Sequence, residues 1–322
     1  MCDTIQGQIS FFDGDIPFKI DKPIRLIELF AGIGAQAAAL ERLQVPFEHY
    51  RICEFDKYAV KSYNAVHGTS FYPSDITKIH ADDLCIVDTD KYCYIMTYSF
   101  PCQDLSLAGK QKGMEKGSGT RSGLLWEVER LLNECDELPQ VLLLENVPQV
   151  CGKKNADDFA AWCAFLEGLG YKNSIFVLNA NQYGTPQERH RLFMISAKTH
   201  IRKPPHQAKA NIENYLNIRE GEQFYGIWDG YNHRVRRNNT VGTITRNVGA
   251  DIKGNGQGVI TYRNHELHIR SLYPIEAWRL MGFTDEQFNR AKEAGISDTQ
   301  LYKQAGNSIV VDVLYRIFKE LL

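Results

Sequence analysis

Short apolar runs that are typical of buried strands alternate with stretches of helical periodicity between residues 24 and 197. Strands with continuous apolar sequence, separated by helices, are typical of a parallel sheet that is covered by helices on both faces. The alternation therefore predicts an α/β fold. The expected strands are 25–30, 49–54, 94–99, 141–145, 174–178 and 192–196, and the expected helices are 35–43, 58–66, 124–135 and 159–169.

The pattern changes after Lys198, where two prolines and a glycine-rich basic stretch follow. Residues 198–270 hold 12 Lys and Arg against 6 Asp and Glu, although the whole chain carries a formal charge of −2. Because phosphate attraction follows the local field, we expect this segment to face a polyanion; an unevenly charged solvated surface is the alternative. The further expected elements are strands at 240–245 and 258–262 and helices at 275–281, 285–294 and 308–321.

These changes divide the chain into four regions. They are an N-terminal extension (1–22), an α/β domain (23–197), a smaller basic module (198–268) and a C-terminal region (269–322) whose last helix is expected to pack on the α/β domain.

Composition excludes several other classes of protein. The chain is 43% hydrophobic and 24% charged, as in ordinary globular proteins, and no apolar run approaches the about 20 residues of a membrane helix. The start of the chain does not match a signal peptide, so we expect a cytoplasmic protein. The eight cysteines include no CxxC pair, which argues against a zinc ribbon, and we expect no metal.

The ends of the first two expected strands indicate a cofactor site. The first strand runs into Gly32 and Gly34 before a helix, and glycines there allow close backbone approach to an anionic ligand. The second ends at Glu54 and Phe55, an acid that suits a ribose diol and an aromatic ring that suits adenine. A nucleoside-containing cofactor is the prediction, and a tight turn with a solvated acid is the alternative.

Two later strand ends carry candidate catalytic groups. Cys102 follows the strand 94–99, at the edge where ligand crevices of α/β sheets lie, although most single cysteines are inert. The segment 109–123 holds five glycines, three lysines and Arg121, which predicts a lid that closes on a phosphate backbone; a disordered surface loop is the alternative. Glu145 ends the next strand, where a buried acid needs a partner or a role.

Arg189 and Arg191 lie two apart in the segment that enters the expected strand 192–196, so their side chains are expected to face the same side, where they suit a carboxylate or a phosphate.

In this order, the segments resemble the motifs of the cytosine-5 DNA methyltransferase family, of bacterial or phage type, from Arg25 to the C-terminus. Ser99 is a departure, because a glycine is common there. The resemblance implies a Rossmann-like methyltransferase domain with a smaller target-recognition domain, S-adenosylmethionine as cofactor, S-adenosylhomocysteine as product and double-stranded DNA as partner. The matching segments are 30–34, 100–103, 145–147, 182–191, 272–283 and 304–308.

The resemblance also implies a role for each candidate residue. Cys102 attacks carbon 6 of a cytosine flipped from the duplex, Glu145 engages N3 and the amino group, Arg189 holds the base carbonyl and Arg191 supports the site. The implied cofactor residues are Phe30, Ala31, Gly32, Ile33, Gly34, Glu54, Phe55, Asp75, Ile76, Pro101, Asn307 and Ser308. The implied DNA-binding residues are Lys110, Lys112, Arg121, Arg234, Arg236, Arg237, Thr245 and Arg246.

Two alternative functions stay open at this point. A transfer-RNA cytosine-5 methyltransferase shares the fold and the chemistry, but the basic module favours duplex DNA. A catalytically inactive DNA-binding homologue is disfavoured because Cys102, Glu145, Arg189 and Arg191 are all present. We expect a monomer without membrane contact, and a cognate restriction endonuclease is a further partner that the resemblance allows.

Overall fold

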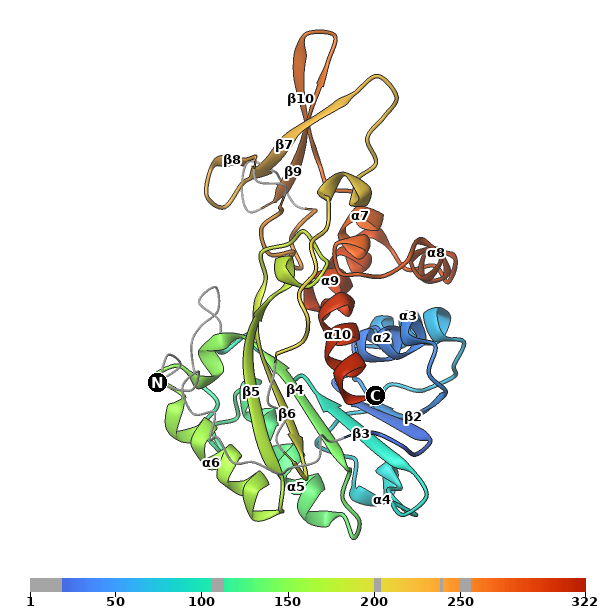
Figure 1. Cartoon of the computed structure of the whole chain (residues 1–322), viewed down its shortest axis with the longest axis vertical. Helices are drawn as coiled ribbons and strands as arrows, with labels where there is room; N and C mark the ends of the chain where they lie inside the picture. Colours follow the sequence, from blue (N-terminus) through green and yellow to red (C-terminus); the bar gives the residue numbers. More distant parts are fainter. Residues whose placement is uncertain (1–18, 106–112, 200–203, 238–239, 250–255) are drawn as a thin grey trace.

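The computed structural model of the chain describes residues 19–105, 113–199, 204–237, 240–249 and 256–322. A helix-covered sheet forms one end of the molecule and a smaller sheet forms the other, with the C-terminal helices beside the region between them (Figure 1). Most of the N-terminal extension, together with Lys110 and Lys112 of the expected lid, lies outside the described residues.

The larger sheet has six strands in the order β2-β1-β3-β4-β6-β5. All strand pairs among β1 to β4 are parallel as expected, but β6 runs antiparallel to both of its neighbours. A short connection joins β5 to β6, and only antiparallel neighbours can be joined without a long crossover. The strands are β1 (Ile24–Leu29), β2 (Phe47–Cys53), β3 (Cys93–Tyr98), β4 (Val141–Asn146), β5 (Lys172–Asn179) and β6 (His190–Ala197).

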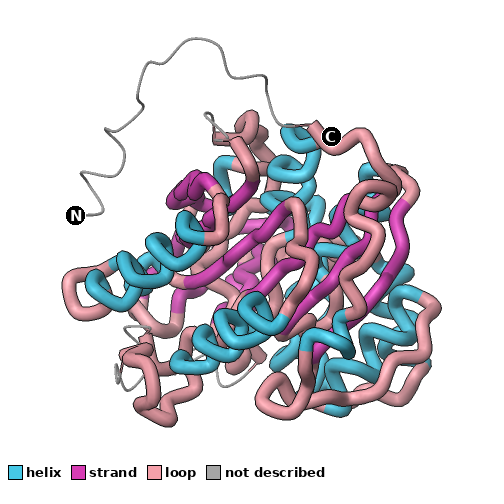
Figure 2. The backbone as a smooth tube through the Cα atoms, turned by 90° about the horizontal axis from the view of Figure 1, so that it is seen from below, coloured by secondary structure: helices cyan, strands magenta, loops and turns pink. Residues whose placement is uncertain are grey.

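Helices cover both faces of this sheet (Figure 2). Alternate strand residues enter two separate cores: Leu26 and Ile95 pack in the core that includes Leu40, whereas Ile27 and Met96 pack in the core that includes Trp162. This period of two explains why the strands are apolar throughout. The helices are α2 (Ala35–Leu43), α3 (Lys57–His67), α4 (Ala81–Leu84), α5 (Leu125–Glu134) and α6 (Ala156–Gly168), with 3-10 turns at Ser122–Leu124, Pro148–Cys151 and Ala180–Gln182.

The smaller sheet is antiparallel and has the order β10-β9-β7-β8. Its strands β9 and β10 are joined by Asn264 and His265, both with positive φ, as a two-residue hairpin loop requires. The expected strand at 240–245 is wrong, because only Val241 forms an isolated bridge, to Gln187. The strands are β7 (Gln223–Asp229), β8 (Arg234–Arg236), β9 (Gln257–Arg263) and β10 (Glu266–Ser271), preceded by a 3-10 turn at Ile212–Tyr215.

Four helices follow the smaller sheet. The helix α9 was not expected from the sequence, although Ser297 caps it by accepting a hydrogen bond from the Gln300 backbone. The last helix packs against α2, as expected, but begins at Val311 rather than residue 308. No helix among the described residues is long and apolar enough to cross a membrane. The four are α7 (Pro274–Arg279), α8 (Asp285–Glu293), α9 (Asp298–Asn307) and α10 (Val311–Leu321).

Candidate active site

The candidate catalytic residues meet at the carboxyl edge of the larger sheet. Cys102 follows β3, and Glu145 lies at the end of the adjacent strand β4. Because β6 runs antiparallel, its first residues lie beside the last residues of β4, with Glu145 opposite Phe193. The reversed strand therefore brings Arg191 to the same edge as Glu145 and Cys102.

The Cys102 thiol lies in a charged environment. Burial raises the pKa of the Cys102 thiol above its usual value, and the nearby Glu145 carboxylate acts in the same direction. Arg191 and Arg189 oppose that rise, because a positive charge stabilises a thiolate. The two arginines are therefore the groups that favour the nucleophilic form of Cys102.

Glu145 is a buried carboxyl group with one arginine partner. Its Oε1 atom lies 3.1 Å from Nε of Arg191, and that arginine side chain is 16% exposed. Burial raises the pKa of Glu145, whereas Arg191 and Arg189 lower it. A raised pKa favours the protonated form of a carboxyl group. A protonated carboxyl can act as a general acid or donate a hydrogen bond to a ring nitrogen.

The two arginines differ sharply in their surroundings. Arg189 is buried, and its terminal nitrogens donate to the backbone carbonyls of Ile244 (2.8 Å), Gly306 (3.2 Å) and Ser308 (2.7 Å). Both terminal nitrogens are therefore occupied by the protein. Nε of Arg189 has no hydrogen-bond partner within the described part of the chain, and Arg191 is the arginine that pairs with Glu145.

Two residues that were not among the candidate site residues hold the segment before Cys102. The Asn146 side chain donates to the carbonyl of Phe100 at 3.0 Å, which ties the end of β4 to the nucleophile segment. The Ser122 hydroxyl donates to the carbonyl of Pro101 at 2.6 Å. Asn146 follows Glu145 directly, and Ser122 lies in the glycine-rich segment 109–123, but neither residue received a role of its own from the sequence.

The loop between β1 and α2 has the shape of a ligand cradle. Phe30 adopts a positive φ of 58°, a strained conformation for a residue with a side chain, and such strain gathers at functional sites. A Cβ atom on Gly32 would meet nothing within 4 Å, so space lies open there. A Cβ on Gly34 would instead lie 2.3 Å from Nε2 of His67, so only glycine fits at that position.

Glu54 is anchored beside this cradle. Its two carboxylate oxygens accept the backbone N–H groups of Gly32 at 3.0 Å and Asp56 at 2.8 Å. Each oxygen keeps a further lone pair, so the carboxylate can still accept two hydroxyl groups of a ribose. Phe55 is 76% exposed, which leaves its ring free to stack on a base. These residues fit a nucleoside.

Four further cofactor candidates lie in two other segments, the turn at 75–76 and the end of α9. Asp75 is exposed and Ile76 is buried, in the turn that follows the β2–α3 region. Asn307 is exposed and Ser308 is buried at the end of α9, and Lys303 of that helix pairs with Asp56 at 2.6 Å. The ion pair keeps the end of α9 close to the Glu54 side of the cradle.

The DNA-binding candidates do not form one group. Arg236 is paired with Asp229 at 2.8 Å and Glu188 at 2.6 Å and is mostly buried, so its contact with DNA stays a prediction. Arg121 is exposed but donates to Asp104 and Gln103. The exposed candidates are Arg234, Arg237, Thr245 and Arg246, and Arg237 stacks on Tyr225.

The loop that carries Thr245 and Arg246 is fixed against the end of α9. A Cβ atom on Gly306 would lie 2.0 Å from the backbone nitrogen of Arg246, so the two backbones are in direct contact. The Ile244 backbone N–H also donates to the Gln187 side chain at 2.9 Å. Gln187 and Arg189 therefore hold this loop next to Asn307, a connection that sequence analysis missed.

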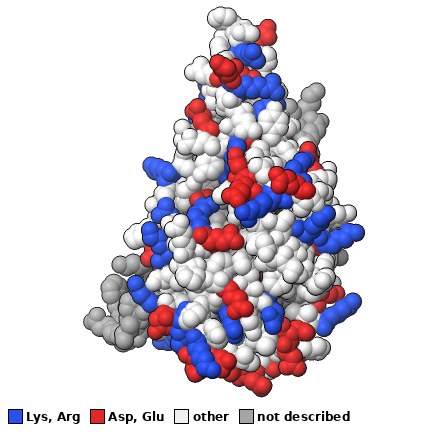
Figure 3. All heavy atoms as spheres, turned by 90° about the vertical axis from the view of Figure 1, so that its right-hand side faces the viewer, with Lys and Arg blue, Asp and Glu red and all other residues white. Residues whose placement is uncertain are grey.

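The face of the molecule on the α8 side carries interspersed positive and negative groups (Figure 3). Its ion pairs include Arg279 with Asp285 at 2.6 Å. Such mixed charge offers no single-sign surface to a polyanion.

The chain is similar to known proteins in sequence and in fold. The family model of the C-5 cytosine-specific DNA methylases matches residues 24–223 and 205–322. Type II methyltransferase M2.ScrFI of Lactococcus lactis subsp. cremoris is 30% identical, over 92% of this chain and 99% of the relative. Orphan methyltransferase M.SssI of Spiroplasma monobiae is also 30% identical, over 93% and 97%. The crystal structure of S. pombe Dnmt2 methyltransferase has a similar fold, with a TM-score of 0.72 at 22% identity, over 94% and 98%.

Proposed function

This chain belongs to the C-5 cytosine-specific DNA methylase family, and from that premise we propose how its residues perform the reaction. The protein is a DNA cytosine-5 methyltransferase. The family model is one of DNA methylases, so the transfer-RNA alternative is not favoured. The observation that carries the proposal is the meeting of Cys102, Glu145 and Arg191 at one edge of the sheet.

We assign the covalent step to Cys102. The thiolate forms a bond to carbon 6 of the flipped cytosine, and the electron pair of the 5,6 double bond makes carbon 5 nucleophilic. Glu145 supplies a proton or a hydrogen bond at N3, which stabilises the negative charge that the attack creates. After carbon 5 has gained the methyl group, loss of its proton expels Cys102 and restores the ring.

The two arginines receive different roles in this proposal. Arg191 lies beside Glu145 and is partly exposed, so it is the arginine that can donate to the base carbonyl. Arg189 acts as a positioning residue, since its donors hold the backbone at Ile244, Gly306 and Ser308. This assignment exchanges the roles that the resemblance implied.

We propose that S-adenosylmethionine occupies the cradle between Gly32, Glu54 and Phe55. The cofactor supplies the methyl group as an electrophile when it is bound. Glu54 accepts the ribose hydroxyls, Phe55 stacks on the adenine, and the Asp75–Ile76 turn meets the adenine edge. Asn307 and Ser308 close the site from the side of α9. The supporting observations are the open space at Gly32 and the exposure of the Phe55 ring.

We propose that target recognition resides in the smaller sheet and the loop at 240–249. The exposed side chains Arg234, Arg237, Thr245 and Arg246 are suited to phosphates and to guanine edges. A chimera that carries residues 198–268 of a relative with a different target should methylate that relative's site. An active chimera that keeps the original specificity would place recognition in the α/β domain.

The wider partners are proposals of the same kind. We expect a monomer that acts in the cytoplasm on double-stranded DNA. The similarity to a type II methyltransferase suggests a cognate restriction endonuclease, and the similarity to an orphan methyltransferase suggests an enzyme without one.

The central test is covalent capture of Cys102. Wild-type protein should form a stable adduct with duplex DNA containing 5-fluorocytosine when S-adenosylmethionine is present, because fluorine cannot leave as the proton does. Cys102→Ser should form no adduct but should still bind the duplex. The matched control is Cys135→Ser, which changes a free cysteine directly after the end of α5 and should form the adduct as wild type does. Capture by Cys102→Ser would refute the assignment.

A further inference from the structure

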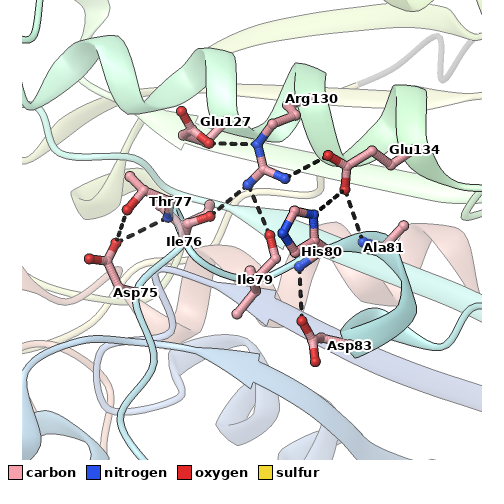
Figure 4. Close-up of polar contacts among 10 residues, drawn as sticks. All are labelled: Asp75, Ile76, Thr77, Ile79, His80, Ala81, Asp83, Glu127, Arg130 and Glu134. Carbon is pink, nitrogen blue, oxygen red and sulfur yellow. Dashed lines mark hydrogen bonds and ion pairs between the residues drawn. The ribbon is translucent and has the colours of Figure 1, made fainter.

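A single arginine of α5 holds the loop that leads away from the proposed adenine edge. Arg130 donates from one terminal nitrogen to the backbone carbonyls of Ile76 and Ile79, each at 2.9 Å. The carbonyl of Ile76 belongs to the turn in which Asp75 accepts the N–H and hydroxyl of Thr77. Figure 4 shows Arg130 reaching down from α5 to both carbonyls.

Two glutamates of the same helix hold the guanidinium in place. Its Nε donates to Glu127 at 2.8 Å and its other terminal nitrogen donates to Glu134 at 2.8 Å (Figure 4). These residues lie at spacings of three and four, so they share one face of the helix. The planar fork of arginine satisfies four acceptors in fixed directions, and lysine has no such geometry.

The contact continues beyond Arg130. The second oxygen of Glu134 accepts the backbone N–H of Ala81 at 3.2 Å and faces Nδ1 of His80 at 3.3 Å. The loop is therefore held at four successive points, Ile76, Ile79, His80 and Ala81, by two side chains of α5. Ion pairs on the surface of a helix do not by themselves require contacts to the backbone of another segment. Here the backbone that is contacted belongs to the loop that carries Asp75.

The other end of the same helical segment contacts the residue that precedes the nucleophile. Ser122, in the 3-10 turn directly before α5, donates to the carbonyl of Pro101. Residues 122–134 thus contact both the segment of Cys102 and the loop of Asp75. Because a helix rises about 1.5 Å per residue, Ser122 and Arg130 are separated by roughly 12 Å of rigid backbone.

We propose that Arg130 is a positioning residue that sets the adenine edge of the cofactor site at a fixed distance from the nucleophile. This inference rests on the proposed function, because it assigns S-adenosylmethionine to the Asp75–Ile76 turn. Arg130 touches neither cofactor nor cytosine; it acts through the carbonyls of Ile76 and Ile79. Loss of these hydrogen bonds should loosen the turn and reduce the affinity for the adenine. The rate of methyl transfer at saturating cofactor should stay the same.

The test is steady-state methylation with Arg130→Lys in the full-length protein. Residues that act through a neighbour change a binding step by about 2- to 30-fold, so KM for S-adenosylmethionine should rise by that factor, with kcat within twofold of wild type. Arg290→Lys is the matched control, because Arg290 also donates to a backbone carbonyl, that of Val66, and to a carboxylate of its own helix. It should leave KM unchanged.

A double-mutant cycle separates positioning from general stability. Asp75→Ala and Arg130→Lys should be non-additive in S-adenosylhomocysteine affinity, since both act through one turn, whereas Asp75→Ala and Arg290→Lys should be additive. Arg130→Lys should also reduce the ratio of the affinities for S-adenosylhomocysteine and S-inosylhomocysteine, because the second compound lacks the adenine amino group. If Arg130→Lys does not fold, Glu134→Gln tests the same loop and should raise KM in the same direction.

The outcomes are distinguishable. An unchanged KM in Arg130→Lys, or a fall in kcat alone, would refute the inference and leave the proposed function intact. Additive losses in the Asp75 cycle would also refute it. Absence of S-adenosylmethionine binding by the wild-type protein would refute the proposed cofactor site, and this inference with it.

Discussion

Matched lysine substitutions at Arg189 and Arg191 should separate stability from catalysis. Arg189 is buried and donates to three backbone carbonyls, whereas Arg191 is partly exposed and pairs with Glu145. A lysine ammonium is a point donor and cannot replace a fork that reaches three carbonyls in fixed directions. We therefore expect Arg189→Lys to lose stability, and Arg191→Lys to lose activity.

The magnitude follows from the number of acceptors that lose a donor. If the ammonium at position 189 keeps one carbonyl, two buried carbonyls are left unpaired, at about 1–3 kcal/mol each. The expected fall in the free energy of unfolding for Arg189→Lys is about 2–6 kcal/mol. At position 191 the lysine keeps the positive charge beside Glu145, so the change in stability should stay below about 1 kcal/mol.

Urea denaturation followed by circular dichroism measures the first quantity, and methylation kinetics on a saturating duplex measures the second. Arg191→Lys should lower kcat by about 10-fold or more, since a charged hydrogen bond to the base is worth about 1.5–3 kcal/mol. Equal stability of Arg189→Lys and wild type would show that the three carbonyl contacts contribute little. If Arg191→Lys keeps wild-type activity, the assignment of the base carbonyl to Arg191 is refuted and Arg189 becomes the candidate for that contact.

Three further predictions concern carboxyl groups. Glu145→Gln should lower turnover by about 10²–10⁴-fold while duplex affinity in fluorescence anisotropy is retained; a loss below about threefold would make this carboxyl structural. Glu54→Ala should weaken S-adenosylmethionine binding about 10- to 150-fold in calorimetry, and unchanged affinity would place the ribose elsewhere. Burial raises the pKa of Glu28 from 4.5 to about 7, so ionising this carboxyl costs stability as the pH rises through that interval. Glu28→Gln should therefore be more stable than wild type by about 1–3 kcal/mol at pH 8 but not at pH 4, and parallel stability curves would contradict this.

The local character of the chain was largely readable from its sequence. The six strands of the larger sheet and the helices α2, α3, α5 and α6 follow from apolar runs and helical periodicity, which are short-range properties. The strand ends also marked Glu54, Cys102 and Glu145, because polar side chains directly after buried strands meet at one edge of a parallel sheet. Resemblance to a known family added the order of these segments and their chemistry.

Short-range patterns could not predict which hydrogen-bond donors are already used. Arg189 and Arg191 are equivalent in sequence, yet packing buries one among three carbonyls and leaves the other beside Glu145. The ion pairs of Arg236 with Asp229 and Glu188 were likewise not predictable from its place in the sequence.

What the sequence determined by itself is therefore the set of elements and the chemistry at their ends. The reversed direction of β6, the contact of the 244–246 loop with Gly306, and the hold of Arg130 on Ile76 were decided only by the tertiary structure. The physical reason is that hydrogen bonds and ion pairs between residues far apart in the chain depend on distances that only packing sets. Backbone carbonyls, which carry no signature in the sequence, accept most of these contacts.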